Sequence, residues 1–231
     1  MTDTTEPLKN QPIKSYVIRA SRLTESQQKA LDTLWDQYVL AFDGGLLNIN
    51  EAFSQAAPLV VEIGFGMGDS LLEMAIAAPD QNFLGIEVHR PGVGKLLHGI
   101  EAHNVTNLKI VCDDASQVIS TGLSPQSIDR LLLYFPDPWH KKRHNKRRLV
   151  QTEFVQMARQ RLRVGAEFHM ATDWEHYAMH MLEIMEAAEG FENNNGKGCF
   201  WKAPIRPETK FERRGLKLGH GVWDLLYTRK D

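Results

Sequence analysis

Residues 59–69, LVVEIGFGMGD, join a short apolar run to three closely spaced glycines. The run 59–63 has the length and composition of a buried strand, and glycine lets the backbone turn sharply and approach a ligand closely. A helix that begins directly after such a turn presents free backbone N–H groups. The stretch therefore predicts a strand, a ligand-binding loop and a helix of an α/β sheet, with an ordinary glycine-rich turn as the alternative.

Predicted strands and helices alternate along the rest of the chain. The strands are expected at 83–88, at 108–112, in the apolar run ending at residue 135, and at about 167–171; the helices between them include 149–163 and 174–188. This alternation is typical of a mostly parallel sheet with helices on both faces. After residue 188 the pattern changes to loops and short strands, ending in 222–227, which we expect to close one edge of the sheet in antiparallel orientation.

The N-terminal region is predicted to be an extension of a single α/β domain. Residues 1–50 read as a polar tail followed by a helix, and residues 51–231 as the domain itself. Thr24 and Gln27 have the spacing of a capping box at the start of that helix, which we expect to end at Gly44 and Gly45.

An acidic residue, Glu87, follows the second predicted strand at the distance from the glycines where a carboxylate commonly accepts ribose hydroxyls. The glycine spacing is G-x-G-x-G, and Asp69 stands where a dinucleotide fingerprint has its last glycine. The pattern disfavours NAD and favours another adenosine ligand.

The segment 134–148, YFPDPWHKKRHNKRR, places a carboxylate beside a dense cationic run. Pro136 and Pro138 bracket Asp137 and stiffen the turn that displays it. Six of the eight residues from 141 to 148 are Lys or Arg, as expected for contacts with phosphates. A solvated loop, a localisation signal, or a turn that merely ends a strand are the alternatives.

The charge distribution indicates a partner that docks on a patch. The formal net charge is only −2, but residues 141–163 hold nine Lys or Arg against one acid, and residues 164–192 hold seven acids and no Lys or Arg. Cys112 and Cys199 lie far apart and read as reduced thiols. With no apolar segment of membrane-spanning length and no signal-peptide pattern, we expect a cytoplasmic protein without membrane contact.

Taken together, these motifs resemble the bacterial tRNA (guanine-N7-)-methyltransferases. The resemblance covers about residue 59 to the C-terminus and rests on EIGFGMG, LGIEVHRPG, CDDA, FPDPWHKKRHNKRR, TDW and RPETKFERRG. It implies a class I, Rossmann-like methyltransferase fold with a seven-stranded sheet, S-adenosylmethionine as methyl donor, and tRNA as partner, with guanine 46 of the variable loop as acceptor.

The resemblance also implies roles for individual residues. The active-site position is Asp137, and the donor-binding residues are Glu62, Gly64, Gly66, Gly68, Glu87 and Asp114. The substrate-binding residues are Lys141, Asp173, Thr209, Lys210, Phe211 and Glu212, and the RNA-interacting residues are Arg143, His144, Asn145, Lys146, Arg147 and Arg148.

Methylation at guanine N7 requires no metal, because N7 already carries a lone pair and a sulfonium methyl group is a strong electrophile. The histidine pairs at 140/144 and 176/180 have metal-ligand spacing but no third ligand nearby, so we expect no metal. Phe135, Trp139 or Phe211 could stack on the extruded base, or serve as ordinary packing.

Two other functional classes stay open on the residues alone. One is a non-catalytic RNA-binding module that retains a vestigial donor fold. The other is an amino-group methyltransferase of DNA or protein, although those enzymes use adjacent prolines where Asp137 separates two. The tRNA reading excludes DNA as a partner, and the chain is expected to be a monomer or a homodimer.

Overall fold

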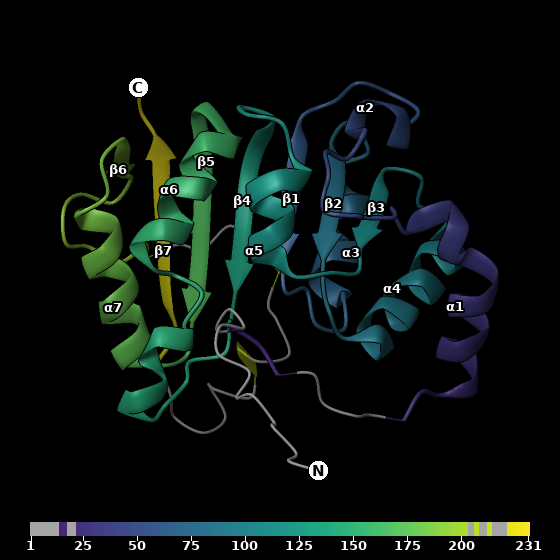
Figure 1. Cartoon of the computed structure of the whole chain (residues 1–231), viewed down its shortest axis with the longest axis horizontal. Helices are drawn as coiled ribbons and strands as arrows, with labels where there is room; N and C mark the ends of the chain where they lie inside the picture. Colours follow the sequence, from purple (N-terminus) through teal and green to yellow (C-terminus); the bar gives the residue numbers. More distant parts are fainter. Residues whose placement is uncertain (1–13, 18–21, 203–205, 208–211, 214–220) are drawn as a thin grey trace, which may run out of the picture.

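A computed structural model of the chain describes residues 14–17, 22–202, 206–207, 212–213 and 221–231. Its elements alternate between strands and helices around one sheet (Figure 1). In chain order they are α1 Glu25–Tyr38, α2 Ile49–Ala52, β1 Leu59–Ile63, α3 Asp69–Ala77, β2 Asn82–Ile86, α4 Arg90–His103, β3 Leu108–Val111, α5 Ala115–Gln117, the π-helical turn η1 Val118–Gly122, β4 Ile128–Tyr134, the 3-10 helix η2 Lys142–Arg147, α6 Thr152–Arg161, β5 Leu162–Thr172, α7 Glu175–Glu186, β6 Phe191–Asn193 and β7 Trp223–Arg229.

The seven strands form one sheet in the order β3-β2-β1-β4-β5-β7-β6. The first five are parallel, and β7 runs antiparallel to both β5 and β6. The predicted mostly parallel sheet with an antiparallel strand near one edge is therefore confirmed, with the short β6 added outside β7. Strand order reverses at β1, whose two neighbours are β2 and β4.

Two hydrophobic cores cover the two faces of the sheet. All five residues of β1 are buried, which is expected for a strand covered on both faces. Val60 points into the core formed with α1, α3 and α4, whereas Val61 points into the core formed with η1, α6 and α7. The period of two along the strand therefore sends successive side chains into opposite layers.

Helix α1 is an integral part of one layer. Its capping box is present, with Thr24 accepting from the Gln27 backbone and the Gln27 side chain accepting from the Thr24 backbone. Gln27 also donates from Nε2 to the Pro91 carbonyl at 3.1 Å, which joins α1 to α4. No helix in the described part of the chain is long and apolar enough to cross a membrane.

Two predicted helix boundaries were wrong. The first helix ends at Tyr38 and not at the Gly44-Gly45 pair, because Val39 forms a parallel bridge to Ile110 and extends the sheet edge at β3. Helix α6 is shorter than the predicted 149–163, and β5 begins at Leu162. In both places the apolar spacing typical of a helix continues past the end of the helix, into a segment that pairs with the sheet.

The glycine loop packs tightly on the start of α4. Gly64, Gly66 and Gly68 all have positive φ, a conformation that other residues rarely adopt. A Cβ atom at Gly92 would lie 1.9 Å from the Gly66 carbonyl oxygen. The absence of a side chain at Gly92 therefore allows the loop and the helix to touch.

We expect Gly92→Ala to destabilise the protein by roughly 1 to 3 kcal/mol, because the new methyl group must displace backbone atoms. The matched control is Gly99→Ala in the same helix, where a Cβ would meet the flexible end of Leu72. Thermal unfolding of the two variants tests this, and equal melting temperatures would contradict it.

Candidate active site

Five acidic residues lie at or after the carboxyl ends of the five parallel strands. They are Glu62 on β1, Glu87 after β2, Asp114 after β3, Asp137 after β4 and Asp173 after β5. Because parallel strands end at the same edge of the sheet, the fold brings these predicted positions to one side of the molecule. In open α/β sheets, ligands commonly bind at this edge where the strand order reverses, which is at β1 here.

Glu62 is the most unusual of these groups. Its side chain is 3% exposed, and its Oε2 atom has no hydrogen-bond partner in the described residues. Burial, and to a lesser degree the neighbouring Glu87 carboxylate, raise the pKa of Glu62 to about 8. A buried carboxyl group without a partner is unfavourable, so this atom points to a ligand that would supply a hydrogen bond or a positive charge.

Glu87 and Asp114 both organise the backbone around this edge. Glu87 accepts hydrogen bonds from the N–H groups of Gly66 at 2.9 Å, Val88 at 2.7 Å and His89 at 2.9 Å. It thereby ties the glycine loop to the turn that starts α4. Asp114 caps the short helix α5 by accepting from the Ser116 N–H at 2.9 Å.

The turn that carries Asp137 is strained on both sides. Phe135 and Trp139 have φ values of 52° and 47°, the left-handed region that side chains other than glycine rarely adopt. Between them, the two prolines fix their own φ and leave Asp137 exposed. Such backbone strain occurs where the surroundings hold a functional segment in place.

The basic run divides into exposed and packed cations. Lys141, Lys142, Arg143 and Lys146 are exposed. Arg148, in contrast, is 2% exposed; it donates to the Pro138 carbonyl at 2.9 Å and lies over the Tyr177 ring at 4.8 Å. Arg148 thus packs against the loop, with its Nη1 atom buried and without a hydrogen-bond partner among the described residues, while its contact with RNA stays a prediction.

The other three positions of the predicted RNA-binding run are partly buried. The Arg147 guanidinium covers the Trp139 ring at 4.2 Å, and His144 meets the same ring edge-on at 5.8 Å. Asn145 accepts at its carbonyl from Gln151 at 3.1 Å. Partial burial and the cations around it lower the pKa of His144.

The N-terminal segment crosses this loop. Trp139 donates from its indole nitrogen to the Ser15 carbonyl at 2.9 Å, and Arg147 donates to the Lys14 carbonyl at 3.2 Å. One face of Trp139 is therefore taken by Arg147, which leaves less of its ring for a base to stack on. The sequence offered no sign of this contact, because residues 14 and 15 share no motif with residues 139 and 147.

The predicted substrate-binding residues are only partly described. Lys141 is exposed and Asp173 is half-buried at the carboxyl end of β5. Glu212 forms an ion pair with Arg206. Thr209, Lys210 and Phe211 lie outside the described residues.

Sequence reasoning missed a buried polar cluster behind the Asp137 turn. It consists of Tyr134, His169, Arg206 and Asp224, which are linked by hydrogen bonds and ring contacts. A signal was available for two of them, since His169 and Asp224 each lie between two apolar residues of a predicted strand, and buried polar side chains need partners.

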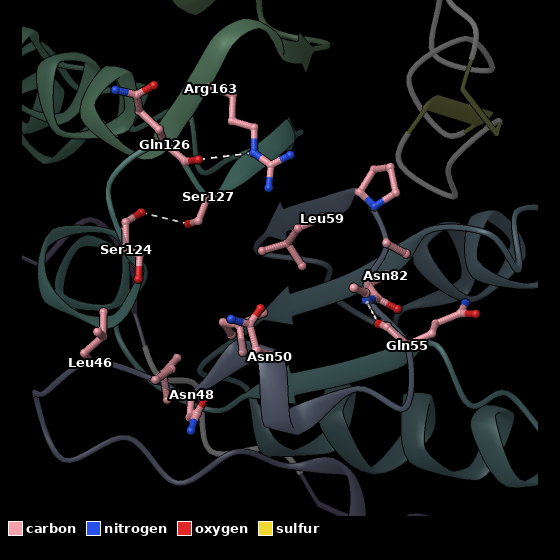
Figure 2. Close-up of a pocket in the computed structure, with 15 residues that line it drawn as sticks. Leu46, Asn48, Asn50, Gln55, Leu59, Asn82, Ser124, Gln126, Ser127 and Arg163 are labelled. Carbon is pink, nitrogen blue, oxygen red and sulfur yellow. Dashed lines mark hydrogen bonds between the residues drawn. The ribbon is translucent and has the colours of Figure 1, made fainter.

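A cavity of about 990 Å³ lies at the opposite edge of the sheet, near the amino ends of β1, β2, β4 and β5 (Figure 2). Figure 2 shows Leu59 and Asn82 on one side of it and Arg163 on another. None of the predicted site residues lines it. Within the described ranges, no group of three His, Cys, Asp or Glu side chains could hold a metal ion.

A family described as "Putative methyltransferase" matches residues 56–225. The tRNA (guanine-N(7)-)-methyltransferase of Ectopseudomonas mendocina (strain ymp) is 51% identical, with 100% of both chains covered, and that of Saccharophagus degradans is 54% identical over 96% of this chain and 97% of the relative.

Among solved structures, the 16S rRNA methyltransferase KamB has a TM-score of 0.55 at 15% identity, covering 92% of this chain and 97% of its own. A variant of the 16S rRNA (adenine(1408)-N(1))-methyltransferase from Catenulisporales acidiphilia, with cosubstrate SAM, has a TM-score of 0.51 at 15% identity, covering 79% and 90%. At these identities the likeness shows a shared fold.

Glu62 should make the stability of the protein depend on pH. Between pH 4.5, the usual pKa of a glutamate, and about pH 8, the folded protein holds a proton at Glu62 that the unfolded chain has lost. The free energy of unfolding therefore falls as pH rises through this window. Glu62→Gln removes this pH dependence. The variant should gain roughly 3 to 5 kcal/mol of unfolding free energy relative to the parent between about pH 5 and pH 9.

Denaturant unfolding of the parent and of Glu62→Gln at several pH values measures this difference. A difference that stays constant across the range would show that Glu62 is ionised in the folded protein as in the unfolded chain.

Proposed function

The chain belongs to the tRNA (guanine-N7-)-methyltransferase family, and we propose that it methylates N7 of guanine 46 in the variable loop of tRNA at the edge where β1 to β5 end. The observation that supports the choice of this edge is that two special carboxyl groups occur on adjacent strands: the buried Glu62, whose Oε2 has no hydrogen-bond partner among the described residues, and Asp137 on a strained turn. The first suits the methyl donor, and the second suits the acceptor base.

The residues at the glycine loop fit S-adenosylmethionine. The buried Glu62 Oε2 lacks a partner, and Gly64 leaves open space where a Cβ would stand. Glu87 would accept the ribose hydroxyls and Asp114 the adenine amine, while Gly66 and Gly68 keep the loop backbone close to the donor. When bound, S-adenosylmethionine would supply an electrophilic sulfonium methyl group, whose transfer to the lone pair of guanine N7 breaks the carbon–sulfur bond and leaves S-adenosylhomocysteine.

Asp137 has two tasks in this scheme. It accepts hydrogen bonds from the N1 and N2 donors of guanine and so orients N7 in line with the donor. Its negative charge also offsets the positive charge that develops on the ring during transfer. The strained turn supports this assignment, because it fixes the carboxylate before the base arrives.

Lys141 and Asp173 are proposed to contact the acceptor nucleotide beside Asp137. Both belong to segments at the same edge, one after β4 and the other after β5. The exposed cations Lys142, Arg143 and Lys146 are proposed to bind tRNA phosphates. A tRNA substrate also favours a cytoplasmic location, and neither donor nor acceptor requires a metal.

Incubation with tRNA and isotope-labelled donor, followed by mass analysis of the nucleosides and mapping of the modified position, tests the proposed function. We expect 7-methylguanosine at position 46. Label in an amino group of DNA or protein would indicate an amino-group methyltransferase, and RNA binding without label would indicate a binding module.

Asp137→Asn should lower the single-turnover rate of methyl transfer by about a hundredfold, because the amide keeps the shape of the turn but removes the charge. Donor affinity, tRNA affinity and melting temperature should stay close to those of the parent. The control is Asp80→Asn, which changes another exposed aspartate directly after a proline, at the far end of β2. Parental rates for both variants would reduce Asp137 to a turn residue.

The exposed and packed cations of the basic run should behave differently when replaced by alanine. Log affinity for tRNA falls with log salt concentration, and the triple variant Lys142→Ala, Arg143→Ala, Lys146→Ala should make this fall less steep by roughly 0.7 to 0.9 per lost contact. Its melting temperature should be unchanged. Arg148→Ala should lower the melting temperature, because it removes a buried anchor of the loop. An unaltered slope in the triple variant would mean that the run is only solvated.

A further inference from the structure

The Arg206 side chain forms a buried link between the C-terminal segment and the strand that carries the Asp137 turn. Its side chain is 1% exposed. It grips Asp224 of β7 with two hydrogen bonds, from Nε at 2.7 Å and from Nη2 at 2.9 Å. It also donates to Glu212 from Nη1 and, at 3.2 Å, from Nη2.

The same guanidinium lies against the end of β4. Its centre is 5.5 Å from the Tyr134 ring and 5.3 Å from the Phe135 ring. A guanidinium that both pairs with carboxylates and stacks on rings cannot be replaced by an ammonium group without losing the planar contacts. The position of the Arg206 guanidinium is therefore coupled directly to the conformation of Tyr134 and Phe135.

Two further hydrogen bonds fix the position of this link. His169 of β5 contacts Asp224 at 2.8 Å through Nε2 and the Tyr134 hydroxyl at 3.0 Å through Nδ1. The cluster is thus closed, since Tyr134 is held by His169 on one side and by Arg206 on the other. The Arg206 guanidinium contacts both carboxylates, so Glu212 and Asp224 each have a cationic hydrogen-bond donor.

Phe135 is the first of the two strained residues around Asp137. Its N–H donates to the Ala171 carbonyl of β5 at 2.8 Å, and its ring lies against Arg206. Because Pro136 follows directly with a fixed φ, a rotation at Phe135 would swing the Asp137 carboxylate away from its present direction. The contacts that hold Phe135 therefore determine where Asp137 points.

We propose that Arg206 is a positioning residue for the methyl transfer: seated by Glu212 and Asp224, it holds Phe135 in its left-handed conformation and so aims Asp137. This inference rests on the proposed function. It also assigns Glu212 to act through Arg206, in place of the direct substrate contact that the family resemblance implies.

The first test is Arg206→Lys, which keeps the charge but loses the bidentate fork and the ring contacts. Single-turnover methyl transfer at saturating donor and tRNA should fall at least about tenfold, because the reacting groups lose their alignment. Dissociation constants for donor and tRNA should change little. The matched control is Arg130→Lys, also on β4 and paired with Glu167 at 3.5 Å, which should keep the parental rate.

A double-mutant cycle with Glu212→Gln separates the two roles of Glu212. If Glu212 acts through Arg206, the double variant should be about as slow as the slower single variant, because each change breaks the same link. If Glu212 binds tRNA directly, the two rate effects should multiply, and Glu212→Gln alone should weaken tRNA binding.

Three outcomes would overturn the inference: a parental rate for Arg206→Lys, multiplicative effects in the cycle, or a loss of rate matched by equal losses of donor and tRNA affinity. If Arg206→Lys does not fold, Asp224→Asn and Glu212→Gln provide the same comparison. A parent protein that forms no 7-methylguanosine would refute the proposed function itself, which is a different result.

Discussion

The central constraint of this structure is the position of β1, which has a parallel neighbour on each side. From β2 the sheet continues to β3 on one side of β1, and from β4 it continues to β5 on the other side. The loop after β1 therefore turns toward β2 and α4, while the loop after β4 turns toward β5. Sheets with such a reversal commonly bind ligands at this point, outside the carboxyl ends of the strands. The glycine loop and the Asp137 turn follow the adjacent strands β1 and β4, so the topology brings both to this point of the sheet.

Burial and hydrogen bonding distinguish two neighbouring carboxyl groups at this edge. The buried Glu62 Oε2 has no hydrogen-bond partner among the described residues, and burial raises the pKa of Glu62. Glu87, in contrast, accepts hydrogen bonds from three backbone N–H groups. A cationic ligand entering here would find one carboxyl group able to ionise in response and one already fixed in place.

Much of this arrangement was accessible from the sequence, because local patterns decide it. The run before the glycines and the run predicted to end at Phe135 have the composition of buried strands, and the second strand ends one residue earlier, at Tyr134. Thr24 with Gln27 marked the true start of α1. The end of α1 was not accessible, since Val39 leaves the helix for a bridge to a strand far along the chain. The burial of Arg148 and the Arg206 cluster were hidden for the same reason: their partners are distant in sequence, and a cationic run looks uniform until packing divides it.

The place of β7 in the sheet has a consequence for the order in which the sheet assembles. β7 follows β6 in the chain, yet it lies between β5 and β6, so β6 cannot join the sheet until β7 is in place. Asp224 lies on β7, and its hydrogen bonds to Arg206 form only with that strand in place. The five parallel strands precede β7 in the chain and could pair before it, but they would then lack the contacts behind the Asp137 turn. Insertion of β7 thus completes both the sheet and the support of that turn.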